Sequence, residues 1–177
     1  MFKKFNLWKK KIEQPSREKQ IEVFCNLYDA FKLIDLDWKS KYAGFERILF
    51  DSKLVDHWII TSITHDALTY IAGNGFSKKN TGIVRGHNID RKVRAENMFT
   101  NTFDSSQDVF DYFMEHDKVT LITKNENGIK KGPSDWSTIY QLDKNLFPYR
   151  CGYAATYTDA ALDYFKKLAK EVNITQK

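Results

Sequence analysis

The first clear periodicity in the chain is a stripe of apolar residues spaced three or four positions apart, as on one face of a helix. Ser16 stands just ahead of the stripe, where a hydroxyl accepts a hydrogen bond from a backbone N–H that a helix leaves unpaired. We therefore predict a helix from about Arg17 to Leu36. The apolar stripe consists of Ile21, Phe24, Tyr28, Phe31 and Ile34.

Two further helices are predicted in the middle of the chain from capping residues. Thr64 resembles an N-cap for a short helix over residues 65–72, which a glycine-containing turn then ends. Asn88 or Asp90 starts another helix that continues through Phe99. This second helix would carry several basic side chains in its first turns.

Two more helices follow towards the C-terminus. Ser105 and Asp108 have the spacing of a capping box, which predicts a helix over residues 104–115. Thr158 or Asp159 caps a final helix. The buried stripe of that helix is predicted to be Ala161, Leu162, Phe165, Leu168 and Val172.

Alternating and β-branched residues predict strands between these helices. Residues 118–124, KVTLITK, alternate as expected for a strand. Residues 149–157 are predicted to form a second strand, and residues 53–63 are either a strand or the end of a buried helix. The pattern as a whole indicates an α+β fold, mainly helical, with a small antiparallel β-sheet.

Length and composition indicate one globular domain. The chain has 177 residues, of which 42% are hydrophobic and 15% aromatic, enough to form a core and too apolar for a disordered chain. Residues 1–14 mix lysines with aromatic side chains and form a basic N-terminal arm, so the domain is expected to span residues 15–177.

Two observations bear on location. No segment approaches the roughly 20 apolar residues that cross a bilayer, and no secretory signal follows the N-terminal lysines. The two cysteines, Cys25 and Cys151, are far apart in sequence and suggest neither a disulfide framework nor a zinc site. We expect a cytoplasmic protein without membrane association.

The net charge of +5 favours a polyanionic partner, and the basic residues that matter are those that cluster. One cluster lies in residues 82–99, GIVRGHNIDRKVRAENMF. Arginine presents a planar fork to phosphate oxygens, and histidine exchanges protons near neutral pH. The predicted phosphate contacts in this cluster are Arg85, Arg91, Lys92 and Arg94, beside His87.

A second polar cluster follows the predicted strand, in the sequence LITKNENGIKKG. Oxygen-bearing side chains, among them Asn127, stand next to Lys130 and Lys131, which we predict to contact phosphate as well. Together with His87, this arrangement over residues 83–132 resembles the HNH nucleases, in which a histidine ends one strand and a second strand delivers an Asn or His ligand at a helix start.

The resemblance implies a metal-dependent phosphodiesterase acting on DNA or RNA. His87 would be both the general base that activates water and a metal ligand, and Asn127 would be the second ligand. Asn97 or Asn101 would orient the histidine. The cofactor would be Mg²⁺ or Mn²⁺, which accept oxygen and imidazole ligands. In this sequence Gly86 stands where such nucleases often carry an acidic ligand, and no CxxC pair is present.

Two alternatives to the nuclease are a non-catalytic nucleic-acid-binding module, such as a small regulatory or phage-type accessory protein, and a module that binds an acidic protein. We interpret His57, His65 and His116 as structural. Glu46 and Asp51 have the spacing of ordinary acidic residues on a helix surface. The chain has no P-loop, no GxGxxG after a strand and no HExxH.

Overall fold

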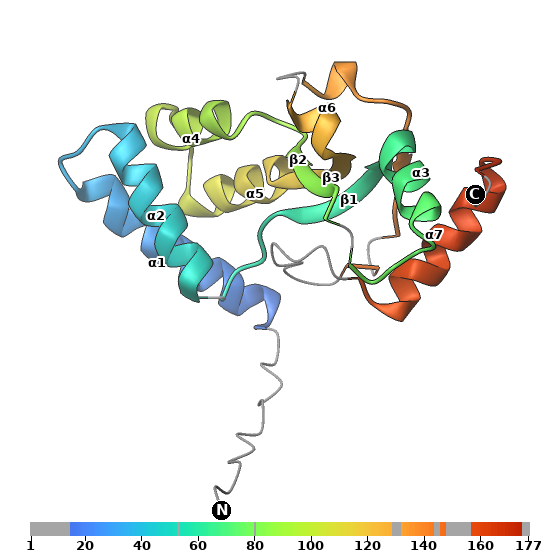
Figure 1. Ribbon diagram of the computed structural model, residues 1–177. Helices are drawn as coiled ribbons and strands as arrows, with labels where there is room; N and C mark the ends of the chain where they lie inside the picture. The colour runs from blue at the N-terminus through green and yellow to red at the C-terminus, as the bar shows by residue number, and fades with distance from the viewer. Residues whose placement is uncertain are drawn as a thin grey trace, which may run out of the picture.

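The computed structural model describes residues 15–52, 54–79, 81–128, 132–143, 146–147 and 157–174. Within these residues a four-stranded sheet of order β2-β3-β1-β4 lies between two groups of helices (Figure 1). The strands are β1 Ile59–Thr64, β2 Ile83–His87, β3 Lys118–Thr123 and β4 Ile139–Gln141. β3 is the strand that alternation predicted. Of the segment 53–63, which was either a strand or the end of a buried helix, residues 59–63 belong to β1.

One group of helices packs around an aromatic core. Its members are α1 Arg17–Leu33, α2 Trp38–Ser52, α4 Arg91–Thr100 and α5 Ser106–His116. Phe24 lies at the centre of this core, with the rings of Phe45, Phe110 and Phe113 each 5.1 Å away from its own. Burying several aromatic rings in one place is what holds these helices together.

The other group covers the opposite part of the sheet (Figure 1). It consists of α3 His65–Gly73 and α7 Asp159–Glu171, whose side chains Leu68 and Phe165 are fully buried in one core with Ile63 of β1. Leu168 and Val172, which were predicted to be buried on the same face of the final helix as Phe165, are only partly buried.

The predicted helix starts are confirmed. Thr64, Asp90, Ser105 and Thr158 each accept a backbone N–H in the first turn of α3, α4, α5 and α7. α1 ends three residues earlier than predicted, because Asp37 starts a new helix by accepting the N–H groups of residues 39 and 40. The sequence interpretation had not identified that helix, α2.

The sheet is mixed, so the prediction of an antiparallel sheet is only partly right. β2 pairs with β3 and β4 pairs with β1 in the antiparallel sense, but β1 and β3 run parallel. Parallel neighbours need a long connection, and here α3, β2, α4 and α5 all lie between β1 and β3. The prediction of an α+β, mainly helical fold is confirmed.

The polar turn after β3 is a short helix, α6 Lys124–Gly128, rather than a turn. Its capping box is reciprocal: Glu126 N–H donates to the Thr123 hydroxyl at 3.1 Å, and the Glu126 carboxylate accepts Thr123 N–H at 2.8 Å. The arm at residues 1–14, the strand predicted at 149–157 except Tyr157, and the pair Lys130 and Lys131 lie outside the described residues. None of the helices in the described part of the chain combines the length and apolar character of a membrane span.

Candidate functional site

Two residues that precede neighbouring parallel strands form the base of the site. Ile59 of β1 pairs with Lys118 of β3, so Trp58 and Asp117 lie side by side just ahead of the two strands. The Asp117 carboxylate accepts the Trp58 backbone N–H at 2.5 Å. Trp58 has a φ of 53°, in the left-handed region that a bulky residue rarely adopts. The hydrogen bond from its own N–H therefore helps to hold an unfavourable backbone conformation.

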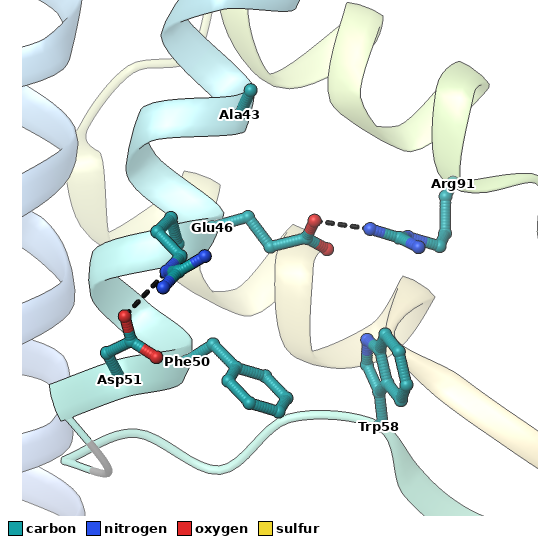
Figure 2. A pocket seen from close by; sticks show the side chains of 7 residues that line it. Ala43, Glu46, Phe50, Asp51, Trp58 and Arg91 are labelled. Atoms are coloured by element: carbon teal, nitrogen blue, oxygen red, sulfur yellow. Dashed lines mark hydrogen bonds and ion pairs between the residues drawn. The ribbon is translucent and has the colours of Figure 1, made fainter. Parts of the chain in front are cut away.

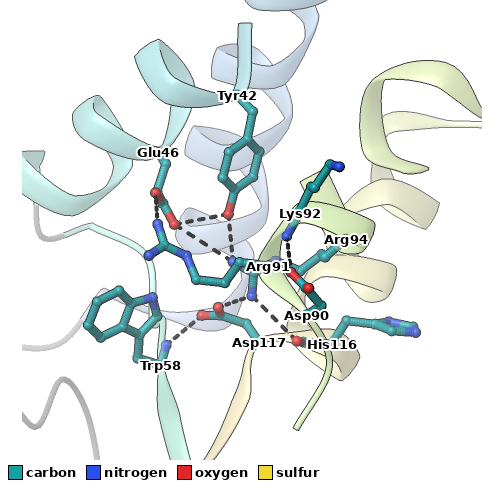
Figure 3. Close-up of polar contacts among 9 residues, drawn as sticks. All are labelled: Tyr42, Glu46, Trp58, Asp90, Arg91, Lys92, Arg94, His116 and Asp117. Atoms are coloured by element: carbon teal, nitrogen blue, oxygen red, sulfur yellow. Dashed lines mark hydrogen bonds and ion pairs between the residues drawn. The ribbon is translucent and has the colours of Figure 1, made fainter. Parts of the chain in front are cut away.

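Asp117 in turn forms an ion pair with Arg94 of α4, and the side chains of both residues are 0% exposed (Figure 3). The Arg94 guanidinium also donates to the Tyr42 hydroxyl at 2.5 Å and to the His116 carbonyl at 3.4 Å. The prediction that Arg94 contacts phosphate on the surface is therefore wrong. Its guanidinium lies inside the protein, where the carboxylate offsets the cost of burying its charge.

Glu46 of α2 links this buried pair to the surface. Its carboxylate accepts the Tyr42 hydroxyl at 2.9 Å, lies 3.7 Å from the Arg94 guanidinium and accepts a hydrogen bond from Arg91 (Figure 3). The Glu46 side chain is 21% exposed and that of Arg91 is 41% exposed. A chain of polar contacts thus runs from Asp117 in the interior to Arg91 at the start of α4.

An open pocket of about 470 Å³ lies where α2 faces the start of α4 (Figure 2). Arg91 and Glu46 point toward one another across it, and Arg47 and Asp51 form a second ion pair of 2.6 Å along α2. Phe50 and Trp58 supply aromatic surface, with ring centroids 6.2 Å apart. The pocket lining consists of Ala43, Glu46, Arg47, Phe50, Asp51, Trp58 and Arg91.

Guanidinium groups collect around the indole of Trp58. The Arg85 guanidinium lies 4.7 Å from the ring centroid and that of Arg91 lies 5.4 Å from it, both within the range of a cation–π contact. Lys92 is also exposed on the first turn of α4, but its side chain points away from Trp58 (Figure 3). Of the predicted phosphate contacts, Arg85 and Arg91 thus meet at one indole.

His87 ends β2 and packs edge-on against Trp58, with ring centroids 5.2 Å apart. Burial, followed by the positive charges of Arg94, Arg91 and Arg85, lowers its pKa to about 3. The imidazole is therefore neutral at pH 7. A general base works best when its pKa is near the working pH, so this histidine is a weak proton acceptor.

The asparagines predicted to work with His87 lie elsewhere. Asn97 donates to the Tyr112 hydroxyl at 2.9 Å, and Asn101 is the C-cap of α4. Asn127 is on α6, beyond the end of the β2–β3 ladder at which Ile83 pairs with Thr123, whereas His87 is at the other end. The two ends are about 14 Å apart along the strand, given a rise of roughly 3.4 Å per residue.

This geometry does not fit the divalent cation that the nuclease interpretation requires. His87 and Asn127 are too far apart to coordinate one ion, and three arginines surround His87. Across the described ranges, no group of three or more His, Cys, Asp or Glu residues is placed to hold a metal ion.

Two of the remaining histidines have ordinary partners in the fold. His65 Nδ1 is 3.0 Å from the Tyr140 hydroxyl, and His116 Nδ1 donates to the Tyr112 carbonyl at 2.7 Å. His57 is buried beside Phe50.

The sequence interpretation missed the pocket because it missed α2. The signal was present: Tyr42, Phe45 and Leu49 are three and four residues apart and are all buried on one face of that helix. Recognising this face would have placed Glu46 and Phe50 on a helix. It would not have shown that this helix faces α4, because that contact joins segments more than 40 residues apart.

The chain matches no protein-family model, no curated protein and no solved structure.

Proposed function

We propose that the protein binds single-stranded nucleic acid in the pocket between α2 and the start of α4, without cleaving it. The observation that carries this proposal is the pairing of aromatic and guanidinium groups in one open pocket: Phe50 and Trp58 beside Arg47 and Arg91. Proteins that bind single strands combine aromatic surfaces for bases with positive charge for the backbone.

The size and shape of the pocket favour a single strand over a duplex. A pocket of about 470 Å³ takes in one splayed base with its sugar, whereas bases inside a duplex are stacked and cannot enter. A base entering here would lie against the Phe50 ring, since aromatic rings stack on bases. The neighbouring phosphates would then lie near Arg91, with Arg85 close by on the other side of the Trp58 indole.

Binding is favoured over hydrolysis because of the state of His87. A nuclease base must take a proton from water, but an imidazole with a pKa of about 3 has little affinity for one. The same histidine is well suited to a structural role, because its neutral ring packs against the indole of Trp58. Its neighbours Arg85 and Arg91 neutralise phosphate without any help from it.

Binding is tested with fluorescently labelled thymine and uracil oligonucleotides over a range of salt concentrations. Phe50→Leu keeps apolar volume but removes the ring, so affinity should fall on the order of tenfold, the loss of one stacked base, with little change in salt dependence. Arg91→Gln should lower affinity and also reduce the salt slope by about one counterion. Lys170→Gln on α7, away from the pocket, is the control and should change neither.

Failure of the wild-type protein to bind any oligonucleotide would overturn the proposal. Binding only to an acidic protein, with no competition from DNA or RNA, would favour the protein-interaction module instead. Cleavage is tested separately with plasmid, single-stranded DNA and RNA in magnesium, manganese or chelator. We expect no cleavage; cleavage that His87→Ala abolishes would restore the nuclease.

A further inference from the structure

Among the described contacts of the two pocket carboxylates, that of Asp51 has an oxygen that accepts no hydrogen bond. Its Oδ2 accepts Arg47 Nε at 2.6 Å, while its Oδ1 makes no hydrogen bond with the described residues. The Asp51 side chain is 58% exposed at the mouth of the pocket. Glu46, the other carboxylate here, already accepts from Tyr42 and Arg91.

An ionised carboxylate only accepts hydrogen bonds, so it selects bases by their donors. Guanine alone among the common bases presents two adjacent donors, N1–H and the N2 amine, on its Watson–Crick edge. Adenine presents an acceptor next to its amine, and thymine or uracil presents a donor between two acceptors. A carboxylate facing that edge therefore attracts guanine and repels the acceptor-bearing edges of the others.

Asp51 is placed to face such an edge. Phe50 precedes it in α2 and carries the aromatic ring of the pocket, and Arg47 lies one turn away (Figure 2). A base lying against Phe50 would present its outer edge toward the carboxylate at the mouth, with its phosphate towards Arg91. The ion pair with Arg47 orients the Asp51 carboxylate along the helix.

We propose that Asp51 makes the pocket selective for guanine, by accepting the N1–H and N2 amine of a base that lies against Phe50. This inference rests on the proposed single-strand binding and adds its specificity. The ligand class is a guanine nucleotide within a single strand.

The test compares thymine tracts that are identical except for one central base. Guanine should bind about three- to tenfold more tightly than adenine, and inosine, which lacks the N2 amine, should fall between them. Asp51→Asn should abolish this order, whereas Asp51→Glu should retain part of it. Asp163→Asn on α7 is the matched control, because Asp163 is also exposed and also pairs with a basic residue of its own helix.

The outcomes separate this inference from the proposed function. If no tract binds, single-strand binding itself fails. If every tract binds equally, or if Asp51→Asn keeps the guanine preference, binding stands and the role of Asp51 is overturned. Guanosine monophosphate and adenosine monophosphate are then added as competitors. Displacement of the tract by the guanine nucleotide alone supports guanine recognition, and it shows that the pocket recognises the nucleotide rather than the strand.

A loss of binding caused by misfolding is recognised from thermal unfolding. Asp51 and Arg47 are both largely exposed, so Asp51→Asn should leave the melting temperature close to that of Asp163→Asn. The preference is read as the ratio of the affinities of one variant for two tracts. A general weakening cancels in this ratio, and only the loss of discrimination remains.

Discussion

Asp117 and Trp58, 59 residues apart in sequence, are joined because the carboxylate of the first accepts the backbone N–H of the second at 2.5 Å. The parallel register of β1 and β3 puts them side by side, and the buried Arg94 holds the carboxylate from the other direction. The indole at the base of the pocket is thus positioned by an ion pair that the solvent does not reach.

Asp117→Asn should destabilise the protein by about 3–5 kcal/mol, because it leaves the Arg94 charge buried without compensation. Asparagine still offers an oxygen to Trp58 N–H, so the variant tests the charge rather than that hydrogen bond. Chemical denaturation measures the loss. Adding Arg94→Met to this variant should cost less than the sum of the two single changes, since it removes the unpaired charge; simple additivity would show that the two residues are not coupled.

Stability should depend on pH through His87. Its pKa is about 3 in the folded protein and 6.5 as a free side chain, so between these values the unfolded chain binds more protons. The contribution of the neutral imidazole to stability is complete above about pH 6.5 and is lost as the pH falls towards 3, to a maximum of about 5 kcal/mol.

The measurement compares unfolding of the wild type and His87→Phe from pH 7 to pH 4. The other titratable groups are common to both proteins, so the difference between their pH profiles isolates His87. A difference that stays constant with pH would contradict the assignment of a neutral, buried imidazole.

Glu46→Gln should strengthen binding of an anionic ligand. The Glu46 carboxylate occupies the Arg91 guanidinium that a phosphate would use, and glutamine keeps an acceptor for Tyr42 without the competing charge. We expect affinity to rise about two- to fivefold, the equivalent of a partly exposed ion pair. Glu171→Gln on α7 removes one charge elsewhere and serves as the control. Weaker binding by Glu46→Gln would mean that the carboxylate supports the site rather than competing with the ligand.

Gly86→Ala should be destabilising by about 1–3 kcal/mol, because β2 approaches its neighbours too closely for a side chain. A Cβ at this position would lie 2.6 Å from the Ile122 side chain and 2.6 Å from the Trp136 ring. Gly73→Ala is the matched control, because no atom lies within 4 Å of a Cβ there and alanine favours its helix. Thermal unfolding of the two variants should shift in opposite directions or differ by several degrees.

Phe165→Ala should cost about 3–5 kcal/mol, as expected for a fully buried ring between α7 and the sheet. Leu168→Ala should cost clearly less, because that side chain is only partly buried. Equal losses of unfolding free energy in the two variants, measured by denaturant titration, would contradict the difference in burial between Phe165 and Leu168.

The sequence by itself determined most of the local structure, because caps and periodicity act over a few residues. Ser16, Thr64 and Ser105 start helices where their hydroxyls predicted them, and alternation identified β3. The capping box of Thr123 and Glu126 was equally readable and was overlooked, as was the apolar face of α2. Helix content and the α+β class follow from such local signals.

Tertiary structure alone decided which basic residues are on the surface. Arg91 and Arg94 are three residues apart in one cluster, yet Arg91 is 41% exposed and Arg94 is 0% exposed. The difference depends on Asp117, which a parallel pairing of distant strands brings beneath α4. That pairing cannot be recognised from a local sequence pattern, because the free energy that stabilises the pairing comes from burying segments that are far apart along the chain.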